Sequence, residues 1–156
     1  MEKETEQELI KRMIGFQKEE ITSSIIYQKL ATKEKDPHNR EILQRIAEDE
    51  SRHYATLRGY THQDVSPNRF EIFFYVWLVR LLGVTFAVRR LELGEKETSG
   101  VYSQYPSMEH FAEMARDEQH HEEKLIEMID EERLQYMGSV VLGLNDALVE
   151  FTGALA

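Results

Sequence analysis

The chain has 156 residues, no cysteine and a formal net charge of −10 at pH 7. The lack of cysteine excludes disulfides, thiolate catalysis, iron–sulfur clusters and cysteine-ligated zinc within this sequence. The negative charge disfavours nucleic acid as a partner and favours cations. Four of the first six residues are charged, and this start does not resemble a secretory signal, so an intracellular setting is expected.

The first predicted helix runs from about residue 5 to about residue 33. Glu20 lies within its apolar stripe, where an apolar residue is the usual occupant. Tyr27 follows seven residues later, close to two full turns, and points the same way. The sequence therefore predicts a carboxylate and a tyrosine on the buried face of this helix.

The second predicted helix runs from about residue 37 to about residue 58. Asp36-Pro37 marks its start, because Asp is a good N-cap and Pro suits the first helical position. Glu50 and His53 interrupt its apolar stripe, and their spacing of three places both on one face. A carboxylate and an imidazole are thus predicted at the centre of the apolar face.

The third predicted helix begins after Ser66-Pro67 with a segment, residues 72–88, that is apolar on almost every side. Arg80 is its only charged residue. A helix that is apolar all round is usually buried on more than one side. We interpret one face as core and the other as a homodimer interface, with shallow membrane contact as the alternative. Gly83 and Gly94 are positions at which this helix could bend.

Glu95 and Tyr102, further along the third helix, repeat the spacing of seven residues. Glu92 lies one turn before Glu95 and is an additional candidate. The fourth predicted helix, from about residue 108 to about residue 136, carries Glu118 and His121 in its apolar stripe. Each half of the chain therefore offers a helix with Glu and Tyr, followed by a helix with Glu-x-x-His.

The two Glu-x-x-His segments, residues 47–57 and 115–125, agree at their Ala, Asp, Glu, second His and Leu positions. Within the later segment, only Glu118 and His121 are expected to face inward. His120 is also spaced three residues from Asp117, but it lies about 100° from that stripe, so it is expected to be exposed. His38, His62 and His110 are also expected to be solvated.

In an antiparallel bundle these side chains would meet in the interior, where uncompensated carboxylates are strongly unfavourable. Two divalent cations would balance four carboxylates, and this ligand pattern holds two irons or manganeses in helix bundles. Such oxygen-rich coordination suits iron(II) or manganese(II) better than zinc. Glu50 and Glu118 are expected to bridge the metals. The candidate ligands are Glu20, Glu50, His53, Glu92, Glu95, Glu118 and His121.

Tyr27 and Tyr102 are candidates for hydrogen bonding to the ligands or for electron donation. The alternative is that both are core aromatic residues. For Glu92, ligation and an exposed or supporting position are equally open.

The motifs Glu20…Tyr27, Glu50-Ser-Arg-His53, Gly94-Glu95…Tyr102 and Glu118-Gln-His-His121 resemble those of the rubrerythrin branch of the ferritin-like superfamily. The resemblance covers residues 5–136. It implies an all-α, antiparallel four-helix bundle with a long connection between helices 2 and 3 and a short C-terminal tail. It also implies a ferroxidase or peroxidase.

The sequence departs from the rubrerythrin pattern at two points. Thr98 stands where rubrerythrins carry a further Glu, whereas Glu92 lies three residues before Glu95. The cysteines of a rubredoxin-like iron site are absent from this sequence, so reducing electrons would have to come from another molecule.

The last segment, residues 143–153, is similar to the opening transmembrane segment of the vacuolar iron transporter family. The combination resembles membrane-bound ferritins. It implies a di-iron domain over residues 1–136 and the start of a transporter-like segment over 137–156, tethered on the cytoplasmic side. Asp146 and Glu150 would then begin an ion pathway. The alternative is a solvated or disordered tail.

The expected function is to oxidise or hold iron(II) for an attached transporter, with dioxygen or hydrogen peroxide as oxidant. The first alternative is a rubrerythrin-like peroxidase that uses an external electron donor. The second is a non-catalytic module that senses iron or dimerises.

Overall fold

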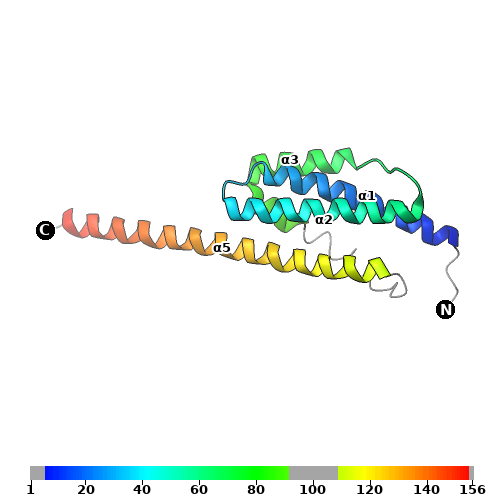
Figure 1. Cartoon of the computed structure of the whole chain (residues 1–156). Coiled ribbons are helices and arrows are strands. Elements are labelled where there is room, and N and C mark those ends of the chain that lie inside the picture. Colours follow the sequence, from blue (N-terminus) through cyan, green and yellow to red (C-terminus); the bar gives the residue numbers. More distant parts are fainter. Residues whose placement is uncertain (1–5, 92–108, 155–156) are drawn as a thin grey trace.

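The computed structural model describes residues 6–91 and 109–154, and the regular secondary structure of this part of the chain is all helical. The helices are α1 (Glu6–Ala31), α2 (Pro37–Thr61), α3 (Arg69–Leu82) and α5 (Glu109–Ala154). Residues 84–91 are also helical. The predicted all-α class is confirmed, and the arrangement is consistent with a ferritin-like helical bundle (Figure 1).

Helices α1 and α2 form an antiparallel pair whose connection is held by side chains. The Oδ1 atom of Asp36 accepts hydrogen bonds from the backbone N–H groups of His38 and Asn39, at 2.8 and 3.0 Å. It therefore caps α2 as predicted. The guanidinium of Arg40 donates to the carbonyl oxygen of Glu34 at 2.8 Å, which closes the connection from the other side.

Helix α3 takes the chain back along α1 (Figure 1), and the connection between α2 and α3, residues 62–68, is not helical. The helix is capped by Asn68 rather than by Ser66, and the Asn68 N–H donates to Oγ1 of Thr22 at 2.9 Å. The expected single third helix is divided at Gly83, which has a φ of 88°. Glycine tolerates this left-handed conformation because it has no Cβ, so the chain can turn here before the next helix begins.

Helix α5 is longer than the sequence pattern indicates. It continues through Tyr136, Met137 and Gly138 to Ala154, and its C-terminal part projects beyond the ends of α1 and α2 (Figure 1). Residues 137–154 are thus a continuation of the helix rather than a separate short tail. The division into domains at residue 136 stays a prediction. Within residues 6–91 and 109–154, no helix has the length and apolarity needed to cross a membrane.

Two apolar clusters fill the space between the helices. The larger cluster contains buried residues from α1, α2, α3, the 84–91 helix and α5: Ile26, Tyr27, Leu30, Ala31, Ile42, Leu43, Ile46, Ala47, Tyr75, Leu78, Ala87, Val88, Leu91, Leu125 and Met128. The smaller cluster contains Met13, Phe16, Leu57, Phe111 and Met114. On α1, α2 and α5, the residues between these two clusters include the polar side chains that the sequence predicts to be ligands.

Candidate metal centre

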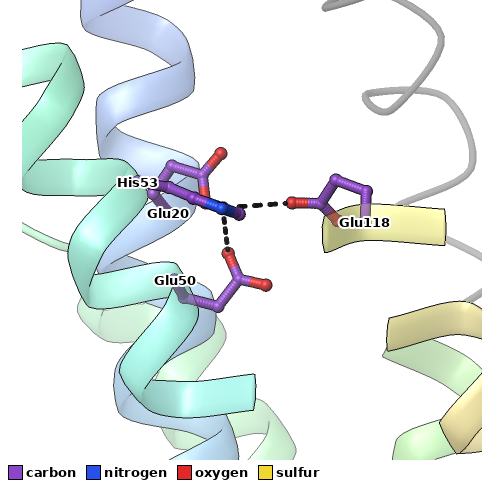
Figure 2. Close-up of side chains that lie close together, drawn as sticks. All are labelled: Glu20, Glu50, His53 and Glu118. Carbon is purple, nitrogen blue, oxygen red and sulfur yellow. Dashed lines mark ion pairs between the residues drawn. The ribbon is translucent and has the colours of Figure 1, made fainter. Parts of the chain in front are cut away.

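A group of acidic and histidine side chains lies between the two apolar clusters. Glu20 comes from α1, Glu50 and His53 from α2, and Glu118 from α5, and one potential ligand atom of each lies within 4.8 Å of the others (Figure 2). Glu20, Glu50 and His53 are 4%, 2% and 3% exposed. Buried carboxylates this close together are strongly unfavourable unless a proton or a cation neutralises them.

The imidazole of His53 faces the carboxylates with its Nδ1 atom. This atom lies 3.4 Å from Oε1 of Glu118 and 3.5 Å from Oε2 of Glu20. It is buried and forms no hydrogen bond within the described residues. A buried nitrogen that faces carboxylate oxygens without bonding to them fits a set of donors directed at a shared cation.

The surroundings of His53 also favour a positive charge on the ring. Burial alone would lower the pKa of His53, but the neighbouring carboxylates of Glu118 and Glu20 raise this pKa to about 10. The imidazole therefore carries a proton at neutral pH in the metal-free protein. That proton supplies positive charge at the position where a metal ion would otherwise supply it.

His121 on α5 extends the group toward a second position. Its Nδ1 atom lies 3.3 Å from Oε1 of Glu50 and, like that of His53, is buried without a hydrogen bond in the described part of the chain. The other oxygen of Glu50 lies 3.9 Å from Nδ1 of His53. The centroids of the His53 and His121 rings are 6.2 Å apart. Glu50 thus lies between the two histidines, which suits the bridging role predicted for it.

Two aspartates contact the Nε2 atoms of these histidines, on the side of each ring that faces away from the glutamates. Nε2 of His53 lies 3.2 Å from Oδ2 of Asp117, and Nε2 of His121 lies 2.9 Å from Oδ2 of Asp49. Each contact crosses between α2 and α5, so the two pairs are reciprocal. A carboxylate on one ring nitrogen fixes the orientation of the imidazole and directs the other nitrogen inward. Asp117 therefore contacts His53 from the outer edge, although it is not one of the inward-facing carboxylates.

Helical spacing alone could not identify these aspartates, because each precedes an inward Glu and lies away from the apolar stripe. Asp49 and Asp117 nevertheless reach the histidine of the neighbouring helix. Their matching positions in residues 47–57 and 115–125 were the available signal. Burial raises the pKa of Asp49, but the neighbouring His121 and Arg52 lower it more, so this carboxyl group is ionised beside its histidine.

The other predicted site residues are placed as follows. Tyr27 is fully buried in the larger apolar cluster, and its role as an electron donor or hydrogen-bonding group stays a prediction. Glu92, Glu95 and Tyr102 lie outside the described residues. The remaining histidines are exposed as expected: His38, His62, His110 and His120.

The fold and this site together define an α-helical protein with a buried carboxylate–histidine group suited to divalent metal ions. Residues 1–60 match the family model named Rubrerythrin, which belongs to the ferritin-like superfamily. The matched part includes Glu20, Glu50 and His53 but ends before α5 begins. The comparisons found no matching curated protein and no matching solved structure.

Proposed function

We propose that this chain binds iron(II) at the buried group and either oxidises it or holds it for an attached transporter. The observation that carries the proposal is the pair of buried Nδ1 atoms, on His53 and His121, directed at carboxylates from three helices. Oxygen-rich donors with one imidazole per metal favour iron(II) or manganese(II). The match of α1 and α2 to the Rubrerythrin family model supports iron.

The full site would hold two ions, with Glu50 and Glu118 between them. Glu20 would be a terminal ligand on one side, and Glu95 would be its counterpart on the other, with Glu92 as an additional candidate. A bound pair of irons supplies electrons for the reduction of dioxygen or peroxide. The chain orients the two imidazoles through Asp49 and Asp117, and apolar side chains flank the site on both sides.

Anaerobic addition of iron(II), followed by dioxygen or hydrogen peroxide in separate samples, tests the proposal. The expected result is binding of two ions per chain and then rapid oxidation by dioxygen, followed by absorbance and Mössbauer spectroscopy. Reaction with peroxide alone, sustained by an added electron donor, would instead identify a rubrerythrin-like peroxidase. Stoichiometric binding without a redox change would leave an iron-sensing module. Failure to bind iron(II) would contradict all three functions.

The proposal extends to the C-terminal segment, residues 137–156, which would lead into a membrane transporter on the cytoplasmic side. The resemblance of residues 143–153 to the vacuolar iron transporter family supports this. The continuous course of α5 would connect the metal centre to such a domain without a flexible joint.

We also propose a homodimer formed through α3. Its outer face exposes Phe70 (79%), Phe73 (66%), Trp77 (50%) and Leu81 (62%). Together these side chains expose on the order of 500 Å², more than half of what each partner of a standard interface buries.

Analytical ultracentrifugation should detect a dimer, and Phe73→Glu with Trp77→Glu should yield monomers. Lys11→Glu with Lys18→Glu, an exposed pair on α1, should not. A monomeric parent protein would refute the dimer and favour membrane contact.

A further inference from the structure

A groove of about 440 Å³ opens between α2 and α5, directly beside the metal centre. Asp49 and His121 form part of its wall. The His121 ring contacts Asp49 through Nε2 and faces Glu50 through Nδ1. One imidazole therefore separates this groove from the buried carboxylates, and the groove is a short path from solvent to the site.

The two strongly basic side chains that line the groove are each paired with a carboxylate on their own helix. Arg45 forms an ion pair with Glu41 on α2. Lys124 forms one with Glu127 on α5, at 2.7 Å. These pairs reduce the repulsion that an approaching cation would otherwise meet, because each positive charge has a negative partner close by.

The groove also contains three exposed side chains of the types that bind divalent metals. His38 and Glu48 come from α2, and His120 comes from α5. None of these three side chains takes part in a hydrogen bond or ion pair within the described residues. Imidazole and carboxylate groups that are not engaged elsewhere can bind a passing iron(II) ion weakly and release it.

We propose that this groove is the route by which divalent cations reach the buried centre. His38, Glu48 and His120 bind the ion transiently at the surface, and Asp49 is the carboxylate that meets it at the inner wall. The inference rests on the proposed metal-binding function and adds its access path. Because the three outer side chains are not final ligands, they set the rate of loading and not the number of ions held.

Cobalt(II) is a suitable probe, because its absorption reports coordination and it undergoes no oxidation on mixing. We expect Glu48→Gln with His120→Ala to slow cobalt(II) uptake in a stopped-flow experiment by about tenfold, the lower end of the effect that focusing charge in a cleft has on association rates. The number of ions bound at equilibrium should not change. Both residues are exposed, so the fold should be retained, which circular dichroism checks.

The matched control is His110→Ala with Glu113→Gln, which removes the same two chemical groups from exposed positions outside the groove. Its cobalt(II) uptake rate should equal that of the parent protein. That result would show that slower uptake in the groove variant comes from the groove residues and not from the change in net charge. Equal rates for both double variants would overturn the groove as the route. Fewer ions at equilibrium in the groove variant would overturn it too, by making these residues ligands. Absence of cobalt binding by the parent protein would instead contradict the proposed function.

Discussion

Replacing Glu118 with alanine is expected to remove at least one metal ion per chain. The Glu118 carboxylate is one of three that lie close to Nδ1 of His53, and its side chain is only 10% exposed. Two ions per chain should bind to the parent protein, and one or none should remain in the variant. Elemental analysis after anaerobic loading with iron(II) and desalting measures this number directly.

The control for this substitution is Glu123→Ala, five residues further along the same helix. Glu123 is exposed and accepts a hydrogen bond from Gln119 on α5, so it lies outside the site. Its metal content should match that of the parent protein. If Glu118→Ala keeps both ions while circular dichroism shows an intact fold, the ligand assignment on α5 is wrong.

The inward positions on α1, α2 and α5 were predictable because each interrupts a helical apolar stripe. Glu20 and Glu50 are predicted to be buried on this ground, and the structure buries both. The two apolar clusters flank these inward positions along the helices. A charged residue in an apolar stripe is informative because burial without compensation is so unfavourable.

The features that the sequence pattern misses depend on neighbouring helices. Asp49 and Asp117 lie off the stripe of their own helices, and only the packing of α2 against α5 shows that each meets a histidine. The break at Gly83 depends on a backbone conformation that composition can permit but not require. At Gly138, by contrast, the helix does not break, and α5 continues through this residue. A glycine weakens a helix by only about 1 kcal/mol relative to alanine.

Binding of a divalent metal is expected to raise the melting temperature on the order of 10 °C. At a free metal concentration one hundred times Kd, each site that exists only in the folded state adds about 2.7 kcal/mol. In a chain of this length, 1 kcal/mol shifts the melting temperature by roughly 2–4 °C. The cations also relieve repulsion among Glu20, Glu50 and Glu118, which the folded state holds together. Manganese(II) is the preferred probe, and differential scanning calorimetry is the measurement.

The shift should be reversed by a chelator and should be smaller in Glu118→Ala, because that variant holds fewer ions. In Glu123→Ala the full shift should remain, which excludes a general effect of divalent ions on an acidic protein. Without metal, the Glu118→Ala variant has one buried carboxylate fewer beside Glu20 and Glu50, and so less repulsion than the metal-free parent protein. The fall in melting temperature when metal is removed from the loaded protein should therefore be smaller in the variant than in the parent protein. A melting temperature that does not respond to chelation of the loaded parent protein would show that the three carboxylates do not share a bound cation.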